Sequence, residues 1–265
     1  MKHTLQKQLL TAGLIGSFAF GATPALATPY FSYDANGLSG AGTTFTANAA
    51  AGVSSEHLYV MSPTTFAGAG WVQFTALTDN SVAVASSSYA NTGLYALFNL
   101  GVTYTGGAGF GQPGSFYSVS SFTVDIYRDM GAANVFTQAN ATTATQASVA
   151  NTAGDVLLGS GVLSGTGFAF IAPNNGAGLN VDANFALNGA TGTSYFYDPV
   201  PFYNLALAAF NSTGGQWTLN SATGMASIGN STGIMDFNRV PEPGTLALLG
   251  AALLGLGFTS RSRKQ

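Results

Sequence analysis

The chain has 265 residues, and charged side chains make up only 6% of it. Between residues 28 and 240, nine acidic residues stand against two basic ones, Arg128 and Arg239, which gives this body a net charge of −7. These numbers argue against nucleic-acid binding, because several Lys and Arg side chains are needed to neutralise a phosphate backbone. The absence of cysteine excludes thiol catalysis, thiolate metal sites and disulfides.

The first 27 residues have the three parts of a secretory signal peptide. Lys2 and Lys7 supply a positive N-terminal region, and an apolar stretch follows them. Ala25 and Ala27 then place small side chains where signal peptidase cleaves. We therefore predict an N-terminal signal helix, export through the Sec machinery, and cleavage by signal peptidase after Ala27.

The body of the chain, residues 28–239, favours strands over helices. Residues 122–127 alternate apolar with mostly polar side chains, as a half-buried strand does. Further strands are expected at 71–77, 94–104, 155–163, 167–171 and 216–219, with turns at 106–107, 174–176 and 214–215. Many short strands joined by polar turns predict an all-β domain, a β-sandwich of jelly-roll or immunoglobulin-like kind.

Two segments of the body do not fit the strand pattern. Residues 201–210 contain closely spaced Leu and Ala and favour a short helix. Residues 134–152 are rich in Ala, Thr and Gln and predict a long loop or a surface hairpin. Glycine occurs 35 times, which fits disorder, but the 12% of aromatic residues favours a packed fold.

The residues of the body argue against an enzyme. His57 is its only histidine, and one imidazole supplies neither the several ligands of a His-based zinc site nor an obvious catalytic triad. Together with Glu56, it is expected to form a surface pair at the start of a strand. Glycosidases need only two carboxylates, and Asp125 and Asp129 are candidates, although turn chemistry after the strand explains both. We expect no enzyme activity, no cofactor and no metal.

Residues 34–37, Asp-Ala-Asn-Gly, resemble the opening of a calcium loop, in which oxygen donors alternate around a glycine turn. The later acidic ligands of such a loop do not follow. An Asx turn is therefore the favoured interpretation of this segment.

The C-terminal segment, residues 240–265, has three parts in a fixed order. Pro241, Glu242 and Pro243 come first, and an apolar run from residue 245 to 258 follows. Together with its neutral flanks, this run is just long enough to cross a thin bilayer as a single transmembrane helix. The last part is a basic cluster, which the positive-inside rule keeps in the cytoplasm; it consists of Arg261, Arg263 and Lys264.

This order of motif, apolar helix and basic tail at the chain end resembles the PEP-CTERM sorting signal. The resemblance implies a protein that is exported across the inner membrane of a Gram-negative bacterium and inserted there transiently. Exosortase would then remove the C-terminal helix and release the protein to the cell surface or extracellular matrix. The alternative is a permanent single-span anchor.

A second resemblance covers most of the body. Residues 31–37, 201–206 and 236–240 are landmarks that are similar in order and spacing to those of the flocculation-associated PEP-CTERM subgroup. Membership would imply a role in floc formation, in which exopolysaccharide holds cells together.

The expected function is non-catalytic adhesion to exopolysaccharide in flocs or biofilm. Aromatic faces and amides suit neutral sugars, and many weak contacts along a polymer add up. Trp71, Tyr117, Tyr203 and Trp217 are the candidate contacts, although each is also explained as part of the core. The competing hypotheses are a secreted carbohydrate-active hydrolase of the matrix and a permanently membrane-anchored structural protein.

Overall fold

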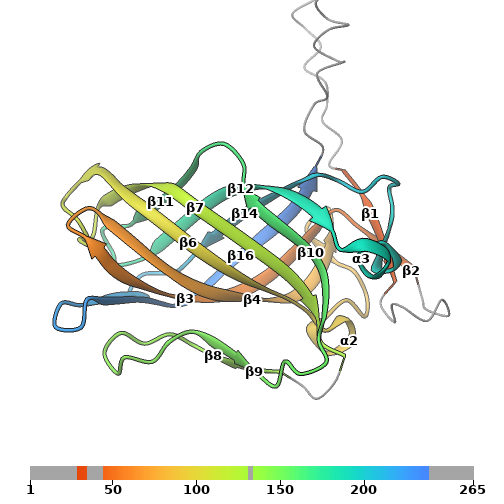
Figure 1. Cartoon of the computed structure of the whole chain (residues 1–265), viewed down its shortest axis with the longest axis horizontal. Coiled ribbons are helices and arrows are strands. Elements are labelled where there is room, and N and C mark those ends of the chain that lie inside the picture. Colours follow the sequence, from red (N-terminus) through yellow and green to blue (C-terminus); the bar gives the residue numbers. More distant parts are fainter. Residues whose placement is uncertain (1–28, 35–43, 131–133, 239–265) are drawn as a thin grey trace, which may run out of the picture.

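The computed structural model describes residues 29–34, 44–130 and 134–238, and most of them lie in β-strands. Nine strands form the main body, which Figure 1 shows lengthwise. They are β3 (Ala49–Ser62), β4 (Thr65–Asp79), β6 (Leu94–Gly107), β7 (Ser115–Arg128), β10 (Val156–Leu163), β11 (Gly167–Ile171), β12 (Ala177–Leu187), β14 (Leu205–Asn211) and β16 (Met225–Asn238).

These nine strands form one antiparallel sheet that closes on itself. Each of β3, β4, β6 and β7 pairs with the next along the chain, and β10 and β11 both lie between β7 and β12. The order continues through β14 to β16, and β16 pairs with β3 to complete the circuit. Closure leaves these strands no free edge on which another chain could pair. We call this unit the closed sheet.

The prediction of an all-β fold is confirmed, but the division into two packed sheets is wrong. A sandwich has two sheets that meet only through side chains. Here hydrogen-bonded ladders continue around the whole circuit, and the strands that follow one another along the chain are neighbours, except β10 and β11. The sequence pattern could not show this, because an inward-facing strand has the same alternation in a sandwich and in a closed sheet.

The inside of the closed sheet is filled by side chains. β7 illustrates the pattern, because its buried apolar residues, Tyr117, Val119, Phe122, Val124 and Ile126, alternate with exposed or half-buried ones. An irregularity near residues 120 and 121, opposite Gly101 and Val102, shifts the alternation by one residue. Side chains of the other strands join these residues in one hydrophobic core.

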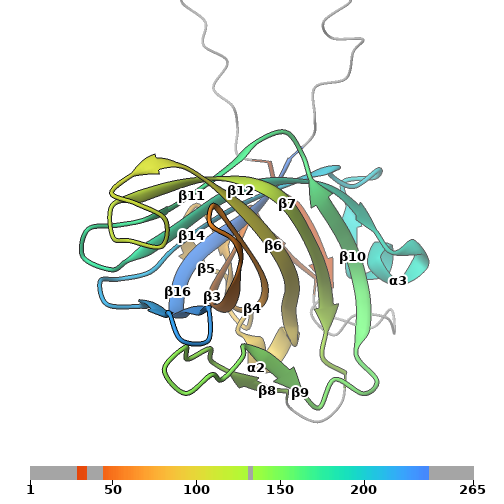
Figure 2. The same cartoon turned by 60° about the vertical axis from the view of Figure 1, so that its left-hand side comes forward.

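Aromatic rings close the end of the sheet at which β16 finishes, which we call the tail end. A small sheet of β1 (Phe31–Asp34), β2 (Thr44–Ala47) and β13 (Phe196–Asp198) lies here, together with the short helix α3 (Gly189–Tyr195). The ring of Phe31 meets those of Phe196, Phe202 and Phe237 with centroids 5.4–6.3 Å apart. Figure 2 shows β10 and α3 together on one side of the sheet.

A second aromatic cluster closes the opposite end, which we call the far end. Phe66 stacks on Phe110 at 4.3 Å between ring centroids and meets Trp217 edge-on at 5.6 Å. Trp217 begins β15 (Trp217–Asn220), and its indole N–H donates to the carbonyl of Gly111 at 3.1 Å. The loop after β6 is thereby held across the opening.

The segment expected as a loop or surface hairpin, residues 134–152, is a hairpin outside the closed sheet. It contains β8 (Val135–Thr137) and β9 (Ser148–Ala150), which Figures 1 and 2 show beside the main body. We call residues 134–150 the arm. The indole N–H of Trp71 donates to the carbonyl of Thr137 at 2.8 Å, and the arm amide of Ala139 donates to Ser55 Oγ at 2.9 Å. These bonds hold the arm against the outer face of β3 and β4.

All the strands expected from the sequence are present. The remaining elements are the two-residue strand β5 (Val82–Ala83) and the short helix α2 (Tyr89–Thr92). The helix expected at residues 201–210 is wrong, because residues 205–211 form β14. Two ladders, to β12 and to β16, satisfy its backbone and override the local helix preference of Leu and Ala. Among the described residues, no helix has the length and apolar character needed to cross a membrane.

Candidate functional site

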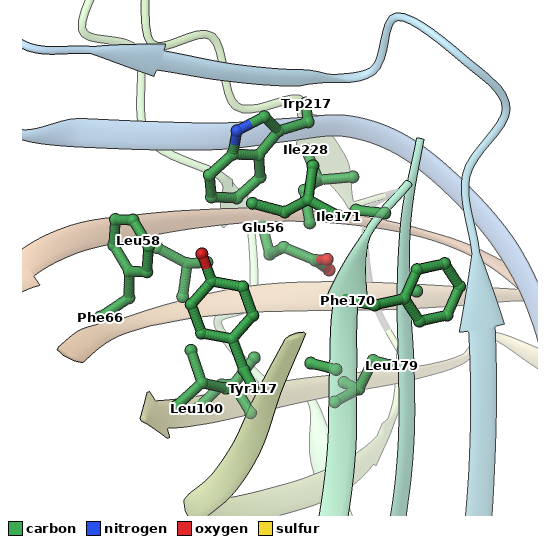
Figure 3. A pocket seen from close by; sticks show the side chains of 14 residues that line it. Glu56, Leu58, Phe66, Leu100, Tyr117, Phe170, Ile171, Leu179, Trp217 and Ile228 are labelled. Atoms are coloured by element: carbon green, nitrogen blue, oxygen red, sulfur yellow. The ribbon is translucent and has the colours of Figure 1, made fainter. Parts of the chain in front are cut away.

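One acidic side chain lies inside the closed sheet. Glu56 is in the middle of β3, where alternate residues point inward, and it is only 5% exposed. Figure 3 shows its carboxylate among apolar side chains that include Leu58, Ile171 and Trp217. Burial raises the pKa of Glu56 from 4.5 to about 7, because a charged carboxylate is poorly solvated there.

Two small cavities adjoin Glu56, with volumes of about 30 Å³ and about 20 Å³. Each has room for a water molecule, whereas small-molecule sites usually occupy about 300 Å³ or more. Around Glu56 the interior of the closed sheet is therefore packed, with room for water molecules but not for a small-molecule ligand.

The expectation of a surface pair at Glu56 and His57 is wrong. Neighbouring residues of a strand point to opposite faces, so Glu56 enters the core while His57 lies on the outer face. His57 is nevertheless only 9% exposed, and burial lowers the pKa of its imidazole. The pair also lies mid-strand, because β3 begins at Ala49, seven residues before Glu56.

Three of the four aromatic residues considered for sugar contacts are buried. Trp71, Tyr117 and Trp217 are exposed by 3%, 3% and 7%. Trp71 holds the arm, and the other two belong to the far-end cluster, where the amide of Gly111 donates to Tyr117 Oη at 2.8 Å. Tyr203 is half-buried, and its hydroxyl donates to the carbonyl of Tyr30 at 2.6 Å. The interpretation of these residues as part of the core therefore holds for Trp71, Tyr117 and Trp217.

The aspartates of β7 are held in different surroundings. Asp125, on the outer face, accepts a hydrogen bond from Ser160 Oγ at 2.6 Å. Asp129, just after the strand, accepts bonds from the hydroxyl of Tyr89 at 3.0 Å and from the amide of Asn134 at 3.1 Å. Asp125 and Asp129 therefore share no partner among these bonds. A different carboxylate, which the sequence pattern did not single out, shares a hydrogen-bond partner with Asp129.

That carboxylate is Asp155, which shares Asn134 with Asp129. The side-chain amide of Asn134 donates to Asp155 Oδ2 at 2.8 Å, and the hydroxyl of Tyr95 donates to the same oxygen at 2.5 Å. The two aspartates are 26 positions apart in the sequence, so no local spacing points to their meeting. Elsewhere too, the described ranges hold no group of three His, Cys, Asp or Glu side chains placed to bind a metal ion.

Two exposed phenylalanines and a half-buried one form a row on the outer face at the far end, which we call the Phe row. Phe116 of β7 and Phe168 of β11 are 46% and 44% exposed. Their rings are stacked 6.0 Å apart, and Phe170 continues the row at 5.9 Å from Phe168. Exposed aromatic groups of this kind are candidates for contact with another molecule.

The residues predicted for sorting lie outside the described ranges. These are Ala25 and Ala27 at the signal cleavage site, Pro241, Glu242 and Pro243, and the basic tail of Arg261, Arg263 and Lys264. Most of the segment considered as a calcium loop, residues 35–37, is also outside them.

Residues 239–264 match the model of the PEP-CTERM protein-sorting motif. The matched range begins one residue after the end of β16 at Asn238 and includes the tripeptide and the basic tail. This motif implies export, a C-terminal membrane-anchored sorting signal, and processing by exosortase. Neither a curated protein sequence nor a solved structure matches the chain.

Proposed function

We propose that the protein is a non-enzymatic adhesion protein of the extracellular matrix, in which it associates with exopolysaccharide and supports floc or biofilm formation. The observation that carries this proposal is the PEP-CTERM match at residues 239–264. In this proposal, signal peptidase and exosortase remove the two ends, and the protein reaches the cell surface or matrix after a transient stay in the inner membrane.

The position of the motif supports a role for the closed sheet after processing. β16 pairs with both β14 and β3, so it completes the circuit before the matched range begins. Cleavage beyond Asn238 therefore removes none of the strand pairs that hold the body together. The β-domain is the part of the chain that remains to act in the matrix.

The charge of the body supports adhesion to neutral polymers. Arg128 is the only Lys or Arg in the described ranges, and its guanidinium lies over the ring of Tyr195, 5.7 Å from the centroid. Polar contacts to a partner must therefore come chiefly from hydroxyl, amide, carboxyl and backbone groups. Such groups can exchange hydrogen bonds with the hydroxyl groups of sugars. Within this proposal, the protein is a member of the flocculation-associated subgroup of PEP-CTERM proteins.

The test is genetic complementation in the native host after deletion of the gene. The full-length gene should restore flocculation. A gene ending at Asn238, and one with Pro241, Glu242 and Pro243 replaced by Ala, should not, because the product is no longer delivered by exosortase.

Mass spectrometry of the extracellular protein should find an N-terminus at Thr28 and no apolar C-terminal helix. An extracellular protein that retains residues 244–265 would contradict processing and favour the permanently anchored alternative.

A hydrolase is a second candidate, favoured by Asp129 and Asp155. Both accept hydrogen bonds from Asn134, which brings two carboxyl groups to one place, as glycoside hydrolysis requires. Release of reducing ends from the host's exopolysaccharide, lost in both Asp129→Asn and Asp155→Asn, would establish this function. Polysaccharide binding without any such release favours adhesion.

A further inference from the structure

A groove of about 410 Å³ lies on the outer face of the closed sheet near the tail end. Its floor is formed by Ala49 and Ala51 of β3, and one wall by Ile234 and Asp236 of β16. The groove is hollow because of the strand register: Ala49 is opposite Asp236, and Ala51 is opposite Ile234. Two methyl groups thus lie beside two longer side chains on the same face.

The opposite wall is a turn that hydrogen bonds hold in place. Asn80 follows β4 and has a left-handed backbone, with φ of 48°. Its amide N–H donates to Asn48 Oδ1 at 3.2 Å, and the Asn48 side-chain amide donates back to Asn80 Oδ1 at 3.3 Å. Asn80 Nδ2 also donates to the hydroxyl of Tyr30 at 2.7 Å. Three segments that are distant in the sequence therefore position this wall.

Asp236 supplies the groove with an acceptor that is not used within the described part of the chain. Its Oδ1 is buried and has no hydrogen-bond partner there. Burial raises the pKa of the Asp236 carboxyl, since water solvates it poorly. A buried acceptor without a partner is costly. Because solvent does not reach this oxygen, a ligand hydroxyl donates to it only when the Asp236 side chain turns toward the groove, and that bond then removes the cost.

The chemistry of the lining selects the class of ligand. A carboxyl group and amide side chains exchange hydrogen bonds with hydroxyl groups, while Ala51 and Ile234 offer apolar contact to C–H groups. Among the described residues that line the groove there is no Lys or Arg, and an ionised Asp236 repels anions. Phosphorylated, sulfated or uronic-acid polymers are therefore disfavoured as ligands. An uncharged polyhydroxyl chain can offer hydroxyl groups to the carboxyl and amide side chains and C–H groups to the apolar ones.

We propose that this groove binds a short stretch of a neutral, hydroxyl-rich polysaccharide, an inference that rests on the adhesion function proposed above. The groove lies on β16, and Asp236 is two residues from the end of that strand. The matched sorting segment starts three positions after Asp236 in the sequence, so its removal leaves the groove residues in place.

Affinity electrophoresis of the mature protein, purified from the host's culture, tests the proposal. The gels contain the host's own exopolysaccharide, dextran as a neutral polymer, or alginate as an anionic one. We expect the exopolysaccharide and dextran to retard the wild type more than alginate does. Ala51→Phe fills the floor, and Asp236→Ala removes both carboxyl oxygens; each should weaken the apparent affinity about tenfold or more.

Two matched variants serve as controls. Val162→Phe adds the same ring as Ala51→Phe at an exposed site of β10, where Val162 is 55% exposed, and it should bind as the wild type does. Phe168→Ser disrupts the Phe row at the far end and should also retain binding. Thermal unfolding shows whether each variant is folded. If Ala51→Phe does not fold, Asp236→Ala tests the groove independently.

The outcomes separate this inference from the adhesion function. Binding that survives both groove variants, or that only Phe168→Ser abolishes, overturns the groove as the site and leaves adhesion standing. A preference for alginate overturns the neutral class of ligand. A wild-type protein that none of the three polymers retards overturns the groove and the adhesion function together.

Discussion

Replacing Glu56 with glutamine should stabilise the protein, and the gain should depend on pH. Glu56 is 5% exposed and lies among apolar side chains in the core. Glutamine has nearly the same shape and carries no charge at any pH. The variant therefore isolates the cost of an ionised carboxylate in this position.

The expected magnitude follows from the pKa of Glu56, which burial raises from 4.5 to about 7. Between these two values the folded protein keeps a proton that the unfolded chain releases. The free energy of unfolding therefore falls as the pH rises, by about 1.4 kcal/mol per pH unit and by about 3 kcal/mol in all. Below this window Glu56 is neutral in both states and the contribution is fully present; above about pH 7 it is lost.

Urea unfolding of the wild type and Glu56→Gln at several pH values measures this difference. Near pH 4 the two proteins should have similar stability, whereas near pH 8 the variant should be more stable by about 3 kcal/mol. Asp198→Asn, which changes an exposed carboxylate, is the control and should keep the pH dependence of the wild type. A gap between wild type and Glu56→Gln that does not change with pH would refute the reasoning.

Two further predictions concern packing. Trp71→Ala removes both the hydrogen bond to Thr137 and the ring that fills the space under the arm. We therefore expect the free energy of unfolding to fall by about 3 kcal/mol and proteolysis within residues 138–147 to become faster. Unchanged cleavage would show that Trp71 does not hold the arm. Gly68→Ala places a Cβ in steric clash with the carbonyl oxygen of His57, so urea unfolding should show a loss of about 3 kcal/mol or more. Gly165→Ala is its control, because this site has φ of +73° but open space around it, and it should cost only about 1–2 kcal/mol.

Local patterns located six strands, β4, β6, β7, β10, β11 and β15, but they missed β12, β14 and β16 of the closed sheet, did not give the extent of β3, and predicted only part of the candidate site. Alternation located β7 and β6, because one face of each strand is buried. The same rule applied to β3 indicates that Glu56 and His57 point to opposite faces. It does not show that the arm, about 80 residues later in the sequence, lies against the outer face of this strand through the bond to Ser55. The groove was missed because Ala49, Asn80 and Asp236 become neighbours only through strand pairing.

The order of residues alone specified the features that depend on composition and on contiguous motifs. The all-β class follows from alternation and turn residues, and the sorting motif at residues 239–264 is read in sequence by the machinery that acts on it. Closure of the sheet, the inward position of Glu56 and the meeting of Asp129 with Asp155 were decided by the tertiary structure. The physical reason is that each depends on contacts between distant segments, whose register is set by packing the whole core and not by any one strand.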